Sequence, residues 1–253
     1  MTRVISVVSG KGGVGKTTVT SNLGTALSRQ GHDVLIIDGN FSGANLAQHF
    51  GLGFSDVTFN DVLRGDAYIT QAVSKHPEGV SIVPASVLEF STNADQLKHS
   101  LVEFLGDKDF VFIDAAAGIG DEVEAAIEAS DEVLLVSEPE LPALTNCLGA
   151  KKMAEQLNRD VLGLVVNGVK NEKSEVSLED AQDLMETNII GKVPDHKHVR
   201  EAIALRKPVV SHKPQSKASL AIRDVAHRVK GNEPPERGLT VRIKSSIHDI
   251  APF

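Results

Sequence analysis

The residues best suited to chemistry lie near the start of the chain, where a run of glycines is interrupted by lysines. Residues 10–18 read Gly-Lys-Gly-Gly-Val-Gly-Lys-Thr-Thr and match the pattern G-x-x-x-x-G-K-[ST]. Glycines let the backbone curl so that successive N–H groups point at phosphate oxygens. Lys16 is predicted to reach the β- and γ-phosphates of a nucleotide, and the Thr17 hydroxyl to bind Mg²⁺. We therefore expect a phosphate-binding loop, or P-loop, at these positions.

The segments on either side of this loop are those that a P-loop requires. The apolar run within Arg3–Ser9 predicts a buried strand before it, and Lys16–Gln30 is compatible with a helix after it. A helix beginning here would add the partial positive charge of its N-terminus. The loop residues predicted to bind nucleotide are Gly10, Lys11, Gly12, Gly13, Val14, Gly15, Lys16, Thr17 and Thr18.

A second lysine sets this loop apart from an ordinary P-loop. Lys11 follows the first glycine, and the run K-G-G-V-G-K-T-T resembles the deviant Walker A motif of the ParA/MinD family of ATPases, most closely its MinD-like branch. The resemblance implies a homodimer that sandwiches ATP, in which Lys11 contacts the phosphates held by the partner subunit. A cation there would stabilise charge on the transferring phosphoryl group. Lys11 and Lys16 are thus candidate catalytic residues, with ATP or ADP and Mg²⁺ as ligands.

The next candidate segment starts where the predicted strand Asp33–Asp38 ends. Residues 38–46 read Asp-Gly-Asn-Phe-Ser-Gly-Ala-Asn-Leu and resemble the switch I segment of MinD-type proteins, in which an Asp-x-Asp pair leads to Asn-Leu. Asp38 takes the first Asp position and is predicted to orient the attacking water or to bind Mg²⁺. Asn40 stands where the family usually has the second Asp. Because an amide cannot take up a proton, we expect slow hydrolysis or altered coupling to the dimer.

A carboxylate also ends the apolar run Phe110–Asp114. A hydrophobic run ending in Asp is similar to a Walker B motif, in which the carboxylate approaches Mg²⁺, usually through water. The following residues resemble the family's switch II pattern Asp-x-Pro-Ala-Gly at Asp114, Ala117 and Gly118, with Ala116 in place of proline. Asp114 therefore joins Thr17 and Asp38 as a predicted metal ligand.

Two later segments resemble the family's adenine-binding loops. Asn167 follows an apolar run, where the family has an Asn that hydrogen-bonds the base, although Gly168 replaces the Arg that often follows. Residues 193–202 are similar to the family's Ile-Pro-Glu-Asp-x-x-Val-Arg-x-Ala. The resemblance implies that Asn167, Pro194 and Asp195 border the adenine.

Alternating apolar and amphipathic runs predict the architecture. The strand candidates are Arg3–Ser9, Asp33–Asp38, Val80–Pro84, Phe110–Asp114, Glu132–Ser137, Val161–Asn167 and Ile189–Val193. The helix candidates are Lys16–Gln30, Ala94–Leu105, Asp121–Ala129, Ala143–Leu157, Leu178–Glu186, His198–Leu205 and Lys217–Lys230. Nearly continuous Val, Ile and Leu is typical of parallel strands buried on both faces. We expect an α/β fold with a doubly wound, mostly parallel sheet of seven to eight strands and helices on both faces, the P-loop NTPase fold.

Composition bounds the organisation of the chain. Its 253 residues suit one large domain, here residues 1–230, followed by a Pro-containing linker and tail over 231–253. The single cysteine, Cys147, excludes an intrachain disulfide and fits a reducing cytoplasm. No apolar run approaches the ~20 residues of a membrane span. We expect a cytoplasmic protein, free or peripherally bound at a membrane or nucleoid.

Charge and tail composition leave the surface on which the protein works open. The net charge is −8, yet residues 191–231 are rich in lysine and arginine, which favours an anionic partner such as DNA. The tail carries apolar residues at helical spacing, which favours a membrane, but also an alternation typical of a strand. The tail residues concerned are Leu239, Val241, Ile243, Ile247 and Ile250.

Two functions fit these features. In the first, ATP builds the dimer and Mg²⁺-dependent hydrolysis dissolves it, so that the protein is an ATPase switch that spatially organises a cellular machine such as a division site, a chromosome or a surface structure. An activating or cargo protein is then expected as a partner. In the second, Asn40 makes turnover negligible, and ATP only licenses binding by a scaffold module.

Overall fold

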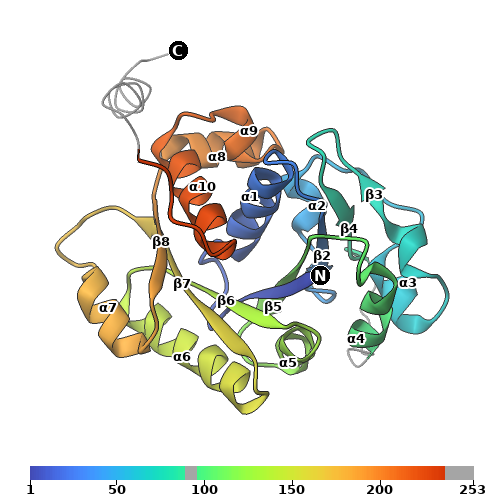
Figure 1. Ribbon diagram of the computed structural model, residues 1–253, viewed down its shortest axis with the longest axis horizontal. Helices are drawn as coiled ribbons and strands as arrows, with labels where there is room; N and C mark the ends of the chain where they lie inside the picture. The colour runs from blue at the N-terminus through green and yellow to red at the C-terminus, as the bar shows by residue number, and fades with distance from the viewer. Residues whose placement is uncertain (89–95, 237–253) are drawn as a thin grey trace.

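A single sheet of eight strands forms the centre of the molecule (Figure 1). The computed structural model describes residues 1–88 and 96–236. The strands are β1 (Arg3–Ser9), β2 (Val34–Gly39), β3 (Ser74–Lys75), β4 (Ser81–Val83), β5 (Phe110–Ala117), β6 (Glu132–Ser137), β7 (Asp160–Val169) and β8 (Ile189–Pro194). Their order across the sheet is β3-β4-β2-β5-β1-β6-β7-β8. Only β3 runs antiparallel to its neighbour. The fold is therefore the predicted, mostly parallel α/β fold.

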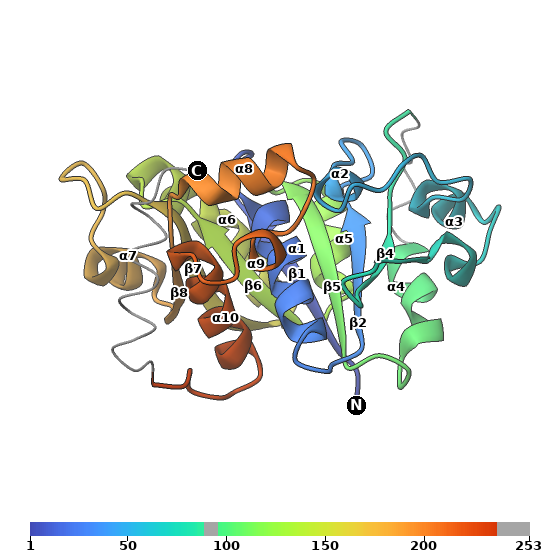
Figure 2. The ribbon, with the colours of Figure 1, turned by 90° about the horizontal axis from the view of Figure 1, so that it is seen from above.

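Helices cover both faces of this sheet. The helices are α1 (Lys16–Ser28), α2 (Leu46–His49), α3 (Phe59–Arg64), α4 (Gln96–Ser100), α5 (Asp121–Glu128), α6 (Leu141–Gln156), α7 (Leu178–Met185), α8 (Lys197–Ala204), α9 (Val209–His212) and α10 (Lys217–Val229). The 3₁₀ helices are η1 (Ile69–Ala72) and η2 (Leu101–Phe104). Helices α1, α2, α8, α9 and α10 lie on one face, and α3 to α7 on the other (Figures 1 and 2).

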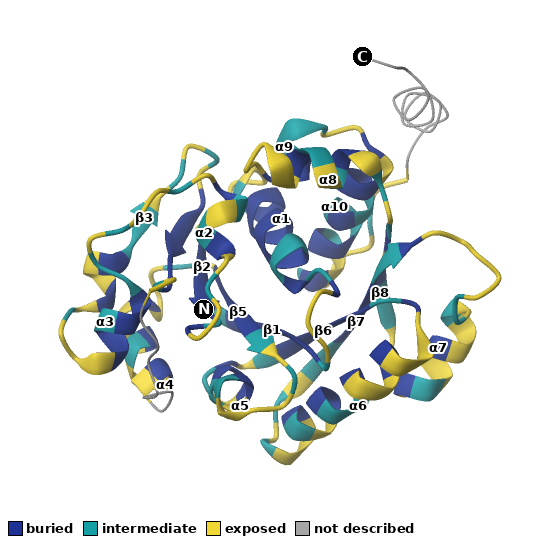
Figure 3. Cartoon of the chain, turned by 180° about the vertical axis from the view of Figure 1, so that it is seen from behind, coloured by how far each residue is buried: buried dark blue, intermediate teal, exposed yellow. Residues whose placement is uncertain are grey.

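The helices on both faces of the sheet explain why the strands carry apolar side chains on both sides. In β2, Val34 and Ile36 face one apolar core while Leu35 and Ile37 face the other, because side chains alternate across a strand. The central strands β1, β2, β5 and β6 are accordingly almost wholly buried, whereas the edge strands β3 and β8 are partly exposed (Figure 3). Each face therefore contributes its own hydrophobic core, and the strand ends are left to carry polar groups.

The long elements agree with the sequence predictions, and so does the short strand β4, but most other short elements were not predicted. Strands β1 and β6 have the predicted bounds, but β3, α2, α3 and α9 were not expected, because elements of two to six residues are too short to show periodicity. The single helix predicted over Ala94–Leu105 is wrong: α4 ends at Ser100 and η2 follows. The Thr2 hydroxyl bonds to the Phe104 carbonyl (3.2 Å) and accepts from Gly106 N (2.7 Å), which turns the chain into β5.

Two expectations fall partly or wholly outside the described residues: the start of the helix predicted from Ala94, and the pattern predicted in the tail. The helical stripe and strand alternation predicted in the tail lie at 239–250, beyond residue 236. The domain boundary near residue 230 stays a prediction. Within 1–88 and 96–236, no helix combines the length and the apolar character needed to cross a bilayer.

The topology places several loops at one edge of the sheet. Strand β1 lies between β5 and β6, and β2 lies beyond β5, so the chain reverses its winding direction around β1. Ligands of open α/β sheets bind outside the carboxyl ends of the strands at such a reversal. The loops after β1, β2 and β5 meet at this edge and contain the residues singled out above.

Candidate functional site

The loop 10–18 joins β1 to α1 and has the backbone conformation of a phosphate cradle. Gly13 and Gly15 adopt φ of +83° and +90°, values that residues with a Cβ rarely reach, and Gly15 caps the N-terminus of α1. Asn167, near the end of β7, donates from Nδ2 to the Val14 carbonyl (2.7 Å). Strand β7 therefore contacts the loop through Asn167, and α1 begins within the motif at Lys16.

The start of the loop lies directly against α6. A Cβ built on Gly10 would come within 2.0 Å of the Asn146 carbonyl oxygen and 2.4 Å of Cys147 N. Gly12, two residues later, has its nearest neighbour at 3.7 Å, the Ala117 Cβ. Gly10 is therefore required for the close approach of loop and helix, and Gly12 is not.

Lys16 is the buried cation of the site. It is only 8% exposed, and burial lowers its pKa while the Asp114 carboxylate acts in the opposite direction. A desolvated ammonium at a helix N-terminus gains strongly from an added anion, since charges attract more strongly away from water. A phosphate bound at this loop would therefore add a favourable charge to that of Asp114 beside Lys16.

Two carboxylates lie side by side at the ends of neighbouring strands. Asp38 on β2 pairs in register with Asp114 on β5, and both are fully buried. Burial and the Asp114 charge raise the pKa of Asp38 to about 7. Burial likewise raises the pKa of Asp114, opposed by Thr17, Lys16 and Thr20. The fold has thus brought two acids together that repel each other unless a proton or a cation intervenes.

The residues around Asp114 suit a hard cation such as Mg²⁺. Its Oδ1 accepts from the Thr20 hydroxyl (3.1 Å), but Oδ2 is buried without a hydrogen-bond partner among the described residues. An orphaned carboxylate oxygen, the Thr17 hydroxyl and a second carboxylate supply the oxygen ligands that Mg²⁺ prefers. The donor set therefore fits the predicted metal, while the assignment of Thr17, Asp38 and Asp114 as ligands stays a prediction.

Asp38 also organises the loop that follows it. Its Oδ1 accepts from Asn40 N (3.2 Å), and its Oδ2 accepts from Asn45 N (3.1 Å) and Leu46 N (3.0 Å). The Thr17 hydroxyl donates to Asn45 Oδ1 (3.0 Å). One carboxylate thus closes the switch I loop on itself, and Asn45 ties the closed loop to the P-loop.

Asn40 has a definite structural role in this loop. Its Nδ2 donates to the Gly43 carbonyl (2.6 Å). An aspartate could not make this bond because an ionised carboxylate has no donor. The residue that departs from the family pattern therefore braces the turn 40–43.

Lys11 differs from Lys16 in its exposure to solvent and in the carboxylate that lies near it. Its side chain is 46% exposed and lies 4.0 Å from the Glu140 carboxylate, measured from Nζ to Oε2. Glu140 precedes α6 and is itself exposed. Within its own subunit, Lys11 therefore reaches out of the loop rather than into it.

The predicted base-binding residues lie on neighbouring strands at the same edge. Asn167 lies two residues before the end of β7, Pro194 ends β8, and Asp195 N donates to the Val169 carbonyl (3.0 Å). The Asp195 carboxylate pairs with Arg200 on α8. The structure brings these residues near the P-loop, through Asn167, but their contacts with adenine stay a prediction.

Sequence reasoning missed several residues that support the site. Thr20 lies one helical turn after Lys16, and Asn146 backs Gly10; neither belongs to the motifs. Helical spacing from the P-loop was the available signal for Thr20. Cys147 is fully buried, and burial raises the pKa of its thiol to about 11, as suits a core residue. No cluster of three or more metal-ligating side chains occurs in the described part of the chain.

The raised pKa values predict how stability depends on pH. The pKa of Asp38 is about 7 in the folded protein and 3.8 for the free side chain. The folded state therefore binds this proton more tightly than the unfolded chain does. The resulting stability is fully present below pH 3.8 and is lost as the pH rises through about 7. Without nucleotide and Mg²⁺, the free energy of unfolding should fall by up to about 1.4 kcal/mol per pH unit from this group.

The measurement is urea denaturation of wild type and Asp38→Asn from pH 4 to 8. Because asparagine does not titrate, the variant should lose less stability over this window. Parallel curves for the two proteins would contradict the prediction, since every other titrating group is common to both.

Comparisons with known proteins agree with this geometry. The pattern of the CobQ/CobB/MinD/ParA nucleotide binding domain matches residues 5–209. An uncharacterized ATP-binding protein of Methanocaldococcus jannaschii is 38% identical over 240 residues, which cover 91% of this chain and 89% of that protein.

Two solved structures share the fold. The septum site-determining protein MinD of Pyrococcus horikoshii, complexed with Mg-ADP, has a TM-score of 0.85 and 33% identity, covering 90% of this chain and 96% of that one. The MinC:MinD cell division protein complex of Aquifex aeolicus has a TM-score of 0.83 and 30% identity, covering 93% of this chain and 98% of that one. Sequence match, shared fold and P-loop together confirm the resemblance: the chain belongs to the CobQ/CobB/MinD/ParA family of nucleotide-binding domains.

Proposed function

We propose that this chain is a cytoplasmic ATPase whose two copies sandwich ATP, and that Mg²⁺-dependent hydrolysis dissolves the dimer. The observation that carries the proposal is the contrast between the two lysines of one loop. Lys16 is buried beside Asp114, whereas the Lys11 side chain is 46% exposed and directed towards Glu140. A loop built this way offers one cation to its own nucleotide and a second to another molecule.

The chain's own residues would divide the work as follows. Lys16 and the N-terminus of α1 bind the terminal phosphates, and Lys11 of the other subunit adds positive charge where negative charge develops. Asp38 positions the switch I loop and the attacking water. Mg²⁺, held by Thr17, Asp38 and Asp114, would neutralise phosphate charge.

The switch would act through the loop that Asp38 closes. Thr17 contacts both the expected metal position and Asn45, so a change in the bound phosphate reaches switch I through one hydrogen bond. Ordering of such loops by a γ-phosphate, and their release after hydrolysis, is an established kind of switching. We therefore propose that the dimer organises a larger cellular machine through a partner protein, as the complex of MinC with MinD supports by analogy.

The experiment is light-scattering mass measurement with Mg-ADP and Mg-ATP. Wild type should double its mass with ATP, because each nucleotide then recruits Lys11 from a second subunit. Lys11→Ala should stay monomeric with ATP while still binding it, and Lys152→Ala, an exposed lysine on α6, should behave as wild type. An ATP-dependent dimer of Lys11→Ala would contradict the proposed role of that residue.

The alternative is a scaffold module that binds ATP with negligible turnover. The specific observation in its favour is the bond from Asn40 to the Gly43 carbonyl, which braces switch I without an ionisable group at position 40. Phosphate release over hours separates the two functions, provided that DNA, anionic vesicles and candidate partners are each added. Dimerisation with ATP but no release under any of these conditions would establish the module.

The same additions of DNA, vesicles and candidate partners test the surface on which the protein works. The basic region 191–231 favours DNA, so binding to duplex DNA should weaken steeply with salt if that surface is used. Pelleting with vesicles tests binding to a membrane. If neither DNA nor vesicles bind the protein, the surface on which it works is that of another protein.

A further inference from the structure

A groove of about 640 Å³ lies next to the switch I loop and is separate from the nucleotide site. Its walls come from three places: α2 with the loop after it, the start of α3, and the segment after β4. Arg206, after α8, closes one end. We propose that this groove is a docking surface for a partner protein that presents an amphipathic helix with a basic flank, and that the bound nucleotide controls its shape. Only the nucleotide control rests on the proposed function.

The groove is bordered by apolar side chains that the fold leaves in solvent. Phe54 is 89% exposed, Leu88 77% and Val87 47%, and the three come from segments on opposite sides of the groove. Apolar side chains gathered around a concavity usually mark an interaction site. Because Phe54 and Leu88 are mostly exposed although they line the groove, a helix lying along it would bury more of both side chains than a small molecule within it.

The charges on the rim identify the kind of helix. On the α3 side, Asp56 and Asp61 line the groove and Asp66 lies nearby; Arg64 contacts Asp61 (2.5 Å) and Asp66 (2.9 Å), and Arg206 is the basic residue among the described lining residues. This side is therefore net acidic and complements lysine or arginine on a partner. An anionic bilayer or a nucleic acid would be repelled by these three aspartates.

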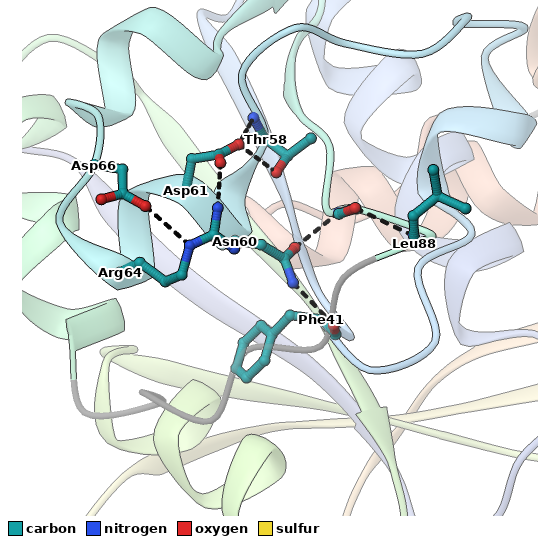
Figure 4. A network of polar contacts seen from close by, with 8 residues as sticks. Phe41, Thr58, Asn60, Asp61, Arg64, Asp66 and Leu88 are labelled. Atoms are coloured by element: carbon teal, nitrogen blue, oxygen red, sulfur yellow. Dashed lines mark hydrogen bonds and ion pairs between the residues drawn. The ribbon is translucent and has the colours of Figure 1, made fainter.

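Two parts of the groove wall, α2 and the segment after β4, are linked to switch I. On one side, Ala47 and Gln48 belong to α2, whose first N–H, at Leu46, donates to Asp38. On the other side, the buried Asn60 bridges two backbones: its Nδ2 donates to the Phe41 carbonyl (3.1 Å), and its Oδ1 accepts from Ser86 N (2.7 Å). Figure 4 shows this chain of contacts from Phe41 through Asn60 to Leu88, whose N donates to the Ser86 hydroxyl (3.2 Å).

These links give the groove a way to sense nucleotide. Phe41 is itself fully buried and packs edge-on against Phe59 of α3, with ring centroids 6.2 Å apart. A movement of residues 38–46 therefore shifts α2 directly and the 86–88 segment through Asn60. A partner that fits one arrangement of the walls would, by reciprocity, favour the corresponding nucleotide state.

The test is a selection of peptides on the full chain. The library consists of helical peptides with a fixed leucine stripe and with flanks drawn from lysine, glutamate and serine. It is selected on wild type with Mg-ATP and counter-selected on Phe54→Ser/Leu88→Ser, which removes only exposed side chains. Enrichment of lysine on one flank is expected. The best peptide should bind the double variant at least about tenfold more weakly than it binds wild type. It should bind the control variant Leu105→Ser, which changes an exposed leucine elsewhere, as tightly as wild type.

Several results would overturn the proposal. These are a selection without enrichment, enrichment of glutamate flanks, equal binding to the double variant, or vesicle binding that depends on Leu88. Equal peptide affinity with ADP and ATP would also overturn it, provided that light scattering shows the ATP dimer. If no ATP dimer forms, the proposed function fails, and selection with ADP alone then decides whether the groove is a docking surface.

Discussion

Replacing Lys16 with alanine is expected to reduce phosphate release from ATP by about a thousandfold. The residue is 8% exposed, and Asp114 is the charged group that acts on it most strongly, so Lys16 is a poorly solvated cation. A terminal phosphate would supply the missing counter-charge. The effect should be large because the interaction takes place away from water, where charge is screened least.

Steady-state phosphate release at saturating Mg-ATP measures this effect. Lys152→Ala on the exposed side of α6 is the matched control, since it removes the same charge without touching the loop. Residual activity of Lys16→Ala within about tenfold of wild type would contradict the role assigned to this lysine. Such residual activity would also place the catalytic charge elsewhere in the site.

Replacing Gly10 with alanine is expected to destabilise the fold by about 3 kcal/mol or more, at the upper end of overpacking effects. The new Cβ would lie 2.0 Å from backbone atoms of Asn146, and a helix backbone cannot yield as a side chain can. Either α6 or the P-loop must move. Because α6 also packs against β6 and β7, the cost should appear in global stability as well as in nucleotide affinity.

The same loop provides the control. Gly12→Ala places its Cβ 3.7 Å from the nearest atom, an ordinary contact, so stability should change little or rise slightly as the unfolded chain loses freedom. Thermal unfolding of both variants measures the difference, with a loss of roughly 10 °C expected for Gly10→Ala. Equal melting temperatures for the two variants would show that α6 accommodates the methyl group.

The fold class, which the structure confirms, and the predicted core of the site both came from sequence, because each depends on local pattern. Continuous apolar runs predicted the parallel strands, and the spacing of glycines and Lys16 predicted the cradle. Asp38 and Asp114 could be placed at strand ends, and therefore at one edge of the sheet, without any coordinates. Lys11 was identified by its place in the motif and by family resemblance.

Tertiary structure alone decided how these groups act on one another. That Asp38 and Asp114 pair in register, so that burial and the Asp114 charge raise the pKa of Asp38, depends on β2 lying beside β5. The contact of Gly10 with α6 joins residues far apart in the chain. Likewise, only the packing of α3 shows that Asn60 connects switch I to the segment 86–88.

The division has a physical basis. Periodicity and motif spacing record interactions within about a turn of helix or a strand, which sequence neighbours can satisfy. Strand order, register and burial arise from contacts between distant segments, and desolvation depends on every atom nearby. The sequence by itself therefore predicted which residues would carry the chemistry, whereas the folded structure decided their burial, their partners and the groove beside them.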